Sequence, residues 1–320
     1  MEKYLITGFS GFVSKHFLEF LESLNTNVAV IGIDINLPEF DYVHYKYVRC
    51  SFIKIDLLDK NQVDNIIYIF QPAYILHLAS FSSVAYSWKN PIASFSNNTN
   101  IFLNLLEQIR SLNLSCRIIS VGSSEEYGNV DEKDIPLTED QILKPVSPYA
   151  VARVSQEMLS RIYVEGYGLD VVLTRSFNHI GPGQRDIFVI SSFAKQLVEI
   201  KKYNKPVELT TGNLSIIRDF VDVRDVVRAY YLLFKAGRKG EVYNICSGNG
   251  VSLEMIIKKM AALLEIEVIT KVDTERIRPN DNKIIIGDSS KIKAEIDWIP
   301  TYTLEDSLRD IINYWYTTIA

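Results

Sequence analysis

The segment YLITGFSGFVSKHF, residues 4–17, decides the fold of this chain. Its first five residues form a short apolar run that ends in glycine, and apolar residues then recur at helical spacing from Phe12 onward. Between these two patterns, Gly8, Gly11 and Ser14 have the spacing G-x-x-G-x-x-S. A glycine-rich turn from a strand into a helix lets backbone N–H groups reach a pyrophosphate at the helix N-terminus. The segment therefore predicts a dinucleotide-binding loop; the alternative is an ordinary strand-to-helix turn.

Asp34 is the second signal for a dinucleotide. It ends the apolar run at residues 28–34, roughly twenty residues after the loop, where a carboxylate can accept both hydroxyls of an adenosine ribose. No arginine follows Asp34 directly to hold a 2′-phosphate, so the sequence favours NAD(H) as cofactor. NADP(H) stays possible because Lys46 and Arg49 could fold back to this position. The alternative is that Asp34 is a solvated residue at the end of a strand.

The order of apolar and amphipathic segments predicts an α/β fold, a Rossmann-type doubly wound parallel sheet. Strands are expected at residues 4–8, 28–34, 52–56, 74–80, 116–124 and 170–178. Helices are expected between them at residues 12–24, 59–70, 91–110 and 147–166. Apolar strands that alternate with helices are typical of a sheet covered on both faces.

After residue 178, glycine, proline and polar residues interrupt this regular order. Helices are still expected at residues 187–202, 223–235, 253–264 and 304–316. We therefore expect two domains. Residues 1–178 form the dinucleotide-binding Rossmann domain, and residues 179–320 mainly form a smaller C-terminal α/β lobe that binds substrate at the carboxyl edge of the sheet.

The composition excludes several classes of protein. A net charge of −5 gives no reason to expect a nucleic-acid partner. No apolar run reaches the ~18 residues that a membrane span needs, and the N-terminus leads directly into a strand. The three cysteines are widely spaced in apolar runs, which is typical of free thiols in a reducing compartment. The four histidines form no ligand cluster, so we expect a cytoplasmic protein without a metal.

The stretch SPYAVARVSQE, residues 147–157, indicates chemistry. It is expected to be helical, which places Tyr149 and Arg153 one turn apart on the same face. A cation beside a phenol stabilises the phenolate, and this makes the tyrosine a usable proton donor or acceptor. The alternative is a plain surface pair on a helix.

These segments together resemble the extended short-chain dehydrogenase/reductase family, which acts on nucleotide sugars. The resemblance covers essentially the whole chain and is carried by TGFSGF (7–12), Asp34, HLAS (77–80), SSEEYG (123–128) and PYAVAR (148–153). Later segments narrow it to the branch that handles GDP-hexoses, with the 4-keto-6-deoxymannose reductases closer than the GDP-mannose 4,6-dehydratases. These segments are RSFNHIGPGQ (175–184), SSFAKQL (191–197), RDFVDVRD (218–225) and IRP (277–279).

The resemblance implies a catalytic set. Ser123 takes the place of the family's active-site serine or threonine, and Tyr149 the place of its catalytic tyrosine. Arg153 occupies the position of a lysine that stabilises the tyrosinate and binds the nicotinamide ribose; a guanidinium can do the first but is longer, planar and differently forked. Glu125 matches the glutamate that removes the C5 proton in dehydratases. Reductases of this branch carry it too, so a pocket-shaping role is an equal alternative.

The resemblance also implies binding residues. The cofactor is expected to contact Gly8, Ser10, Gly11, Phe12, Val13, Asp34, Asp56, Leu57, Leu78, Ala79, Ser80, Asn98, Tyr149 and Arg153. A GDP-sugar is expected to contact Ser82, Ser83, Ser87 and Ser124 around the hexose, Asn178 at the sugar or its phosphate, Val189 and Lys195 near the base, and Arg218 and Arg278 at the diphosphate. For both arginines the alternative is a surface ion pair.

Three functions remain open from the sequence. The first is an NAD(P)H-dependent reductase of a GDP-4-keto-6-deoxyhexose, and the second is a GDP-mannose 4,6-dehydratase or another nucleotide-sugar epimerase or dehydratase. The third is a protein that binds NAD(H) and a nucleotide sugar with little turnover, because Arg153 replaces lysine. The resemblance further implies a homodimer in which the helices at residues 91–110 and 148–166 form a four-helix bundle.

Overall fold

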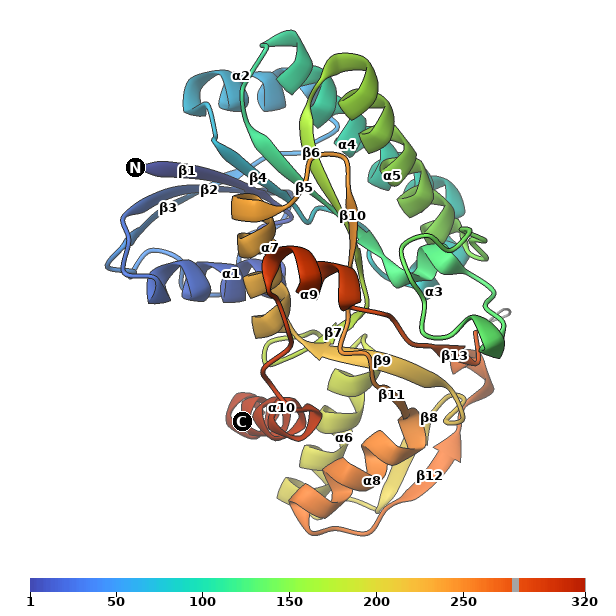
Figure 1. The fold of residues 1–320 in the computed structure, drawn as a ribbon. Helices are drawn as coiled ribbons and strands as arrows, with labels where there is room; N and C mark the ends of the chain where they lie inside the picture. The colour runs from blue at the N-terminus through green and yellow to red at the C-terminus, as the bar shows by residue number, and fades with distance from the viewer. Residues whose placement is uncertain (278–281, 320) are drawn as a thin grey trace.

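The computed structural model describes residues 1–277 and 282–319, and within them seven parallel strands form the main sheet in the order β10-β6-β5-β4-β1-β2-β3 (Figure 1). From one edge to the other these are β10 (Val242–Ile245), β6 (Asp170–Ser176), β5 (Arg117–Ser123), β4 (Tyr74–His77), β1 (Glu2–Thr7), β2 (Val28–Asp34) and β3 (Val48–Lys54). The chain reverses direction across the sheet between β1 and β4, which gives the doubly wound topology. The predicted Rossmann-type fold is confirmed.

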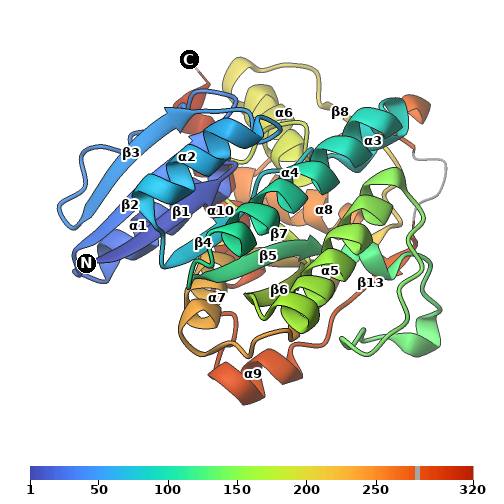
Figure 2. The same cartoon turned by 90° about the horizontal axis from the view of Figure 1, so that it is seen from above.

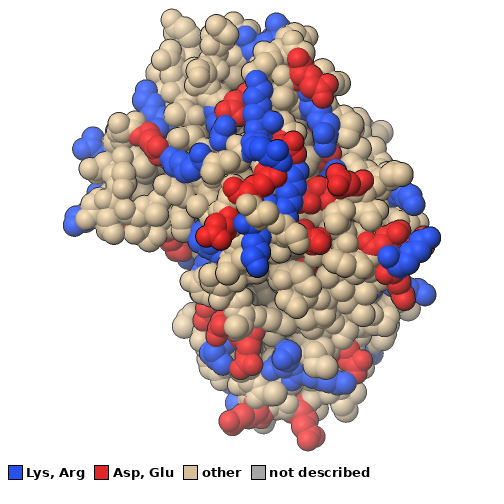
Figure 3. Space-filling model, viewed as in Figure 1, with Lys and Arg blue, Asp and Glu red and all other residues tan. Residues whose placement is uncertain are grey.

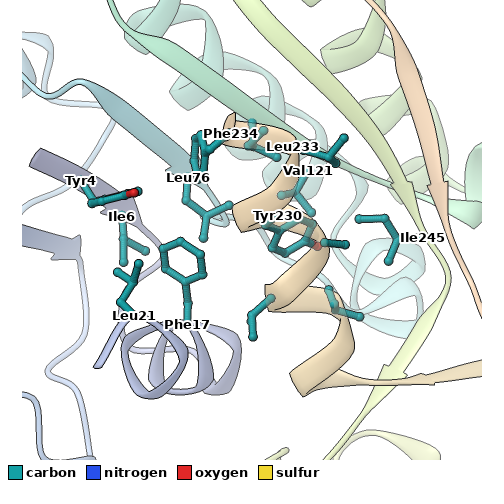
Figure 4. Close-up of a cluster of buried hydrophobic side chains, with 14 of the residues drawn as sticks. Tyr4, Ile6, Phe17, Leu21, Leu76, Val121, Tyr230, Leu233, Phe234 and Ile245 are labelled. Atoms are coloured by element: carbon teal, nitrogen blue, oxygen red, sulfur yellow. The ribbon is translucent and has the colours of Figure 1, made fainter. Parts of the chain in front are cut away.

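Helices cover both faces of this sheet (Figure 2). On one face lie α1 (Phe12–Ser23) and α7 (Val223–Ala236), which pack against each other. The close-up in Figure 4 shows Phe17 and Leu21 of α1 facing Tyr230 and Phe234 of α7 beneath the strands. The other face is covered by α2 (Lys60–Phe70), α4 (Pro91–Ser111) and α5 (Pro148–Tyr167).

Each covering helix buries an apolar stripe at helical spacing. In α4 the buried side chains include Ile101, Phe102, Leu105 and Ile109, all at most 3% exposed. Truncating one such side chain to alanine costs about 2–5 kcal/mol of unfolding free energy. These two buried layers hold the carboxyl ends of the strands in fixed positions, and the candidate site is built on those ends.

A second lobe lies beyond the carboxyl ends of the strands (Figure 1). Its smaller sheet has the order β11-β9-β13, with β7 paired to β9, and β12 pairs with β8 beside it. Its elements are β7 (Asn178–Ile180), α6 (Val189–Tyr203), β8 (Glu208–Thr211), β9 (Ile217–Asp222), β11 (Gly250–Ser252), α8 (Leu253–Leu264), β12 (Ile269–Val272), β13 (Ile284–Ile285) and α10 (Leu304–Thr318). The helices α6, α8 and α10 share one apolar core.

The division of the chain is less simple than the expected boundary at residue 178. Strand β10 forms the edge of the main sheet beside β6, and α7 covers one of its faces, although both follow residue 178. The short helix α9 (Ser290–Ile296) also packs on α7 and β10. The chain therefore returns to the Rossmann layer after it has entered the second lobe.

Most predicted element boundaries agree with the structure within a few residues. The third strand begins at Val48, earlier than predicted, because edge strand β3 has polar and charged side chains on its exposed face. The short helix α3 (Val84–Lys89), capped by the Ser83 hydroxyl, and α9 were missed because neither is long enough to show a helical period.

On the face drawn in Figure 3, acidic and basic side chains are intermixed and form no large patch of one sign of charge. Among the described helices, none combines the length and the apolar character that a membrane span requires. Of the three cysteines, Cys116 and Cys246 are buried free thiols and Cys50 is partly buried.

Candidate active site

A cleft of about 1680 Å³ lies where the strands of the main sheet end and the second lobe begins. Residues from both parts of the chain line it. Of the predicted site residues, those at the cleft are Gly8, Ser10, Gly11, Phe12, Val13, Asp34, Asp56, Leu57, Leu78, Ala79, Ser80, Ser82, Ser83, Ser123, Glu125, Tyr149, Arg153, Asn178, Val189 and Arg218. The fold therefore places predicted segments that are far apart in the chain at one cleft.

The glycine-rich loop at residues 8–13 presents a bare helix N-terminus to the cleft. Gly11 is the N-cap of α1, with no side-chain cap and no acidic residue in the first turn. Gly8 adopts a φ of +69°, and a Cβ there would lie 2.6 Å from the backbone N of Ala79. Uncapped N–H groups and the helix dipole favour an anion at this position. The loop is thus suited to a dinucleotide pyrophosphate.

Asp34 is fixed beside this loop by backbone donors. Its Oδ2 accepts a hydrogen bond of 3.0 Å from the Ser10 N–H, and its Oδ1 accepts one of 2.9 Å from the Asn36 N–H. Glu39 and Asp41 line the same cleft, whereas Lys46 and Arg49 do not. The carboxylate keeps lone pairs with which it can accept further hydrogen bonds.

Tyr149 and Arg153 lie on the first turns of α5. Ser147 caps this helix by accepting a hydrogen bond of 3.1 Å from the Ala150 N–H, and Pro148 occupies the first helical position. Both side chains are buried to more than nine-tenths yet line the cleft. The Arg153 Nε donates to the Tyr149 hydroxyl oxygen over 3.1 Å. Tyr149 and Arg153 therefore form a buried, hydrogen-bonded pair at the cleft and not a pair on an exposed helix face.

Ser123 ends strand β5 and also lines the cleft. Its hydroxyl oxygen accepts a hydrogen bond of 3.2 Å from the Glu125 N–H, which leaves its own O–H free to donate. Glu125 lines the cleft as well. The carboxyl end of β5 and the start of α5 thus place a serine, a tyrosine and a glutamate around one space.

Arg218 is buried, at 5% exposure, and lies at the second-lobe side of the cleft. Its Nη1 donates to the backbone oxygens of Ile217, at 3.0 Å, and Asn282, at 2.7 Å. Asp281, one of the two partners considered for an ion pair with Arg218, lies outside the described residues. Arg278 lies outside the described residues.

Four predicted contact residues do not line the cleft in this structure. Ser87 is fully buried, and its hydroxyl donates to the Val84 carbonyl of the same helix, α3. Ser124 is buried outside the cleft lining. Lys195 forms an ion pair of 2.6 Å with Asp186. Each of these positions was implied by the family resemblance, which does not fix the direction of a side chain in this chain.

Asn98 also lies behind the cleft wall. Its Oδ1 accepts from the Phe81 N–H at 2.7 Å, and its Nδ2 donates to the Phe81 carbonyl at 3.3 Å. It therefore holds the loop that follows β4, while its neighbour Asn97 lines the cleft. Adjacent helical residues point about 100° apart, so a shift of one position exchanges these two roles.

The structure adds residues to the site that the sequence did not select. His179 lines the cleft and stacks on Phe12 with a centroid distance of 5.7 Å. Removal from water, and then the charge of Arg153, lower the pKa of His179 to about 4, so the ring is neutral at pH 7. Tyr230 of α7 and Ser176 of β6 line the cleft too, and their hydroxyls are 2.9 Å apart. Tyr230 was hidden because it belongs to a helix expected in the other domain.

Among residues 1–277 and 282–319 no group of three or more His, Cys, Asp or Glu side chains could hold a metal ion. One cleft is lined by a glycine-rich loop at a bare helix N-terminus, the Asp34 carboxylate and the Tyr149–Arg153 pair. A family model described as GDP-mannose 4,6 dehydratase matches residues 5–311. This chain belongs to the GDP-mannose 4,6-dehydratase family.

Relatives within and around the GDP-mannose 4,6-dehydratase family have several activities. The chain is 30% identical, over 99% of its length and 98% of the relative's, to a GDP-6-deoxy-D-mannose reductase of Pseudomonas aeruginosa. It is 26% identical, over 98% of its length and 93% of the relative's, to a GDP-mannose 4,6-dehydratase of Yersinia enterocolitica. The family assignment confirms the predicted resemblance and the prediction of a nucleotide-sugar enzyme of the oxidoreductase type.

A solved structure supports the same conclusion. The structure of RMD from Pseudomonas aeruginosa complexed with NADPH aligns with 100% of both chains at 30% identity and a TM-score of 0.87. The seven-stranded sheet and the second lobe are thus those of an extended nucleotide-sugar short-chain dehydrogenase/reductase.

Proposed function

We propose that the protein reduces the C4 ketone of a GDP-4-keto-6-deoxyhexose with NAD(P)H, giving GDP-D-rhamnose or its C4 epimer. The observation that carries this proposal is the buried Tyr149 hydroxyl, hydrogen-bonded by Arg153, in the same cleft as the glycine-rich loop. The similarity to a GDP-6-deoxy-D-mannose reductase along nearly the whole chain supports the choice of substrate.

The residues at the cleft fit a nicotinamide dinucleotide. The bare N-terminus of α1 would hold the pyrophosphate, Asp34 the adenosine ribose, and Arg153 the nicotinamide ribose. Leu57, Leu78, Ala79 and Ser80 would border the cofactor from the ends of β3 and β4. When bound, this cofactor supplies the hydride for C4.

Tyr149 would give the proton that the reduced carbonyl oxygen requires. As hydride arrives at C4, negative charge develops on that oxygen, and a donor aimed at it lowers the barrier. The O–H of Ser123 is free to donate to the same oxygen. Arg153 stabilises the tyrosinate that remains after the proton has left. Arg218 would bind the diphosphate with its planar guanidinium, and Ser82, Ser83 and Asn178 would contact the sugar.

NAD(H) is the cofactor we favour, although the solved relative was captured with NADPH. The carboxylates of Asp34, Glu39 and Asp41 line the cleft, and they would repel a 2′-phosphate. Lys46 and Arg49, the cations that could have held such a phosphate, do not line it. This arrangement supports NADH over NADPH.

A GDP-mannose 4,6-dehydratase is the second candidate, favoured by the position of Glu125 at the cleft. Dehydration requires a base at C5 and also a donor for the departing hydroxyl group. In the dehydratase interpretation, Ser123, Ser124 and Glu125 match a run of serine or threonine, polar residue and glutamate, but Ser124 is 2% exposed and does not line the cleft. This placement supports reduction, with Glu125 shaping the pocket.

We also propose a homodimer formed by α4 and α5. These helices pack side by side on one face of the molecule. Val151, Met158 and Ile162 of α5 are 42%, 42% and 56% exposed and recur at helical spacing along one stripe. Phe95 of α4 adds to the same apolar surface at 40% exposure. A second copy of this pair of helices would bury the stripe in a four-helix bundle.

Mass spectrometry of two reactions tests the function. One contains GDP-4-keto-6-deoxymannose with NADH or NADPH, and the other contains GDP-mannose with a trace of NAD. A gain of two hydrogens in the first alone supports the reductase, whereas loss of water in the second supports the dehydratase. No change in either, together with measurable binding of NADH, would support a protein that binds without turnover.

A further inference from the structure

We propose that Gln156 is the positioning residue that lets an arginine act at position 153. The inference deepens the proposed function, because it concerns the group that holds the proton-donating tyrosine. It rests on a buried set of contacts behind the cleft, made by Ser120, Val121, Arg153 and Gln156, which we call the arginine cradle.

The cradle fixes one end of the guanidinium with two acceptors. The Arg153 Nη1 donates to the Gln156 Oε1 at 2.7 Å and to the Val121 carbonyl at 2.9 Å. The Gln156 Nε2 in turn donates to the Ser120 hydroxyl oxygen at 2.9 Å and to the same carbonyl at 3.2 Å. Gln156 is 1% exposed, Ser120 3% and Arg153 4%. Every polar atom of the Gln156 amide is therefore used inside the protein.

The orientation of the Gln156 amide follows from its neighbours. A guanidinium has only donors, so the atom that faces Arg153 must be the amide oxygen. The amide nitrogen then faces an oxygen of Ser120 and the carbonyl of Val121, which are both able to accept. The reverse orientation would oppose donor to donor in a site without access to water. The hydrogen bonds of the cradle thus allow only one of the two orientations of the Gln156 amide.

The contacts divide the guanidinium between two tasks. Nη1 is held by the cradle, and Nε donates to the Tyr149 hydroxyl. Nη2 has no partner within residues 1–277 and 282–319, and Arg153 lines the cleft. Nη2 is accordingly the nitrogen available for the nicotinamide ribose. A lysine ammonium, which is a compact charge on a shorter stem, has no matching planar fork for Gln156 to grip.

A neutral acceptor suits this position better than a carboxylate. Glutamine satisfies a buried N–H and leaves the net charge of Arg153 intact for the tyrosinate. Glutamate would offset that charge, and it would also place an oxygen opposite the Val121 carbonyl, to which the Gln156 Nε2 donates.

A double-mutant cycle tests the proposal. The parent, Gln156→Leu, Arg153→Lys and the double variant are compared for the Kd of NADH, from its fluorescence, and for kcat and KM with the 4-keto sugar nucleotide. We expect Gln156→Leu to weaken NADH binding and to lower kcat roughly tenfold or more in the parent, with KM for the sugar changed less than about threefold. In the Arg153→Lys background the same change should cost less than about threefold.

Equal losses in both backgrounds would overturn the proposal, since Gln156 would then act on the fold and not through Arg153.

Two further measurements separate folding and function from positioning. Ser160→Ala removes a buried hydroxyl of the same helix that contacts the Ser120 hydroxyl at 3.1 Å and the Gln156 backbone carbonyl at 2.9 Å, but neither the Gln156 amide nor Arg153, and it should leave the Kd unchanged. The NADH cycle needs no turnover. If the 4-keto sugar is not a substrate, the cycle still decides the role of Gln156, and the proposed reaction fails on its own.

Discussion

Glu126 accepts a hydrogen bond of 2.7 Å through its Oε1 from the backbone N–H of Ser123. The contact requires Gly122, because a Cβ there would lie 2.4 Å from that oxygen. The Glu126 side chain is fully buried, and its Oε2 has no partner among the described residues. Burial, and then the neighbouring Glu157, raise the pKa of Glu126 to about 8. At neutral pH a carboxyl group that is mostly uncharged thus accepts the hydrogen bond from the backbone N–H of Ser123.

The Glu126 carboxyl should make folding stability depend on pH. Its pKa is raised in the folded chain from an ordinary 4.5, so its contribution is complete below about pH 4.5 and is lost as pH rises toward about 8. Glu126→Gln keeps the acceptor without ionising. The unfolding free energy of the variant minus that of the parent should therefore increase from pH 5 to pH 8, by at most about 1.4 kcal/mol per pH unit, and denaturant unfolding at each pH measures it. Glu165→Gln, an exposed change on α5, is the control and should give a constant difference.

Tyr149→Phe should abolish reduction without loss of binding. The change removes the proton donor, and general acid catalysis of this kind contributes about 10²–10⁴-fold to the rate. We expect kcat to fall by at least about a hundredfold, while the Kd of NADH changes little. Stopped-flow consumption of NADH measures the first quantity and fluorescence titration the second. Retention of more than about a tenth of the parent kcat would mean that another group donates the proton.

Removing the charge at position 153 should cost more than changing its shape. Arg153→Lys retains a cation one turn from Tyr149, and we expect its kcat within about tenfold of the parent. Arg153→Met removes the cation and should lower kcat by about a hundredfold or more. Were Arg153→Lys instead to create activity in a parent that has none, the protein would be one that binds without turnover.

Asp34→Asn should shift the cofactor preference toward NADPH. The amide keeps an acceptor for the Ser10 N–H but removes the negative charge near the expected 2′-phosphate. We expect the ratio of kcat/KM for NADH to that for NADPH to fall by about tenfold or more. Asp59→Asn, which changes the N-cap of α2 away from the cleft, is the matched control. A parent that already prefers NADPH would contradict the assignment of NADH.

Ile162→Asp should separate the proposed dimer. Ile162 is 56% exposed on the stripe of α5, and a carboxylate there would have to lose its water when two copies meet. Sedimentation should show a dimer for the parent and a monomer for the variant. Ile69→Asp, at a position 70% exposed on α2, should leave the dimer intact. If the parent sediments as a monomer, the bundle does not form.

The sequence predicted the parts of the site that local patterns encode. The loop at residues 8–13 carries its own glycine spacing, and the Tyr149 helix carries its own Ser147 cap and Pro148, so a short window of sequence suffices for each. The direction of single side chains was harder. Ser87 and Asn98 lie on helices close to the cleft and point away from it, because their rotation about the helix axis is set by tertiary packing.

Long-range partners were beyond the reach of sequence patterns. The separation of three residues could have paired Gln156 with Arg153 on helix α5. The carbonyl of Val121, however, completes the cradle from strand β5, which is distant in the sequence. Tyr230 reaches the cleft only because α7 returns to the main sheet. Such pairings depend on how the layers are assembled, which a linear pattern does not contain.

The return of α7 and β10 to the main sheet has a consequence for engineering this protein. A fragment cut at residue 178 would lack the neighbour of β6 and the helix that covers Phe17 and Leu21, so an open sheet edge and an apolar face would meet water. Such a fragment is expected to aggregate. Exchanging substrate lobes between relatives would therefore require a graft with several junctions, in which the strand and the helix stay with the cofactor half.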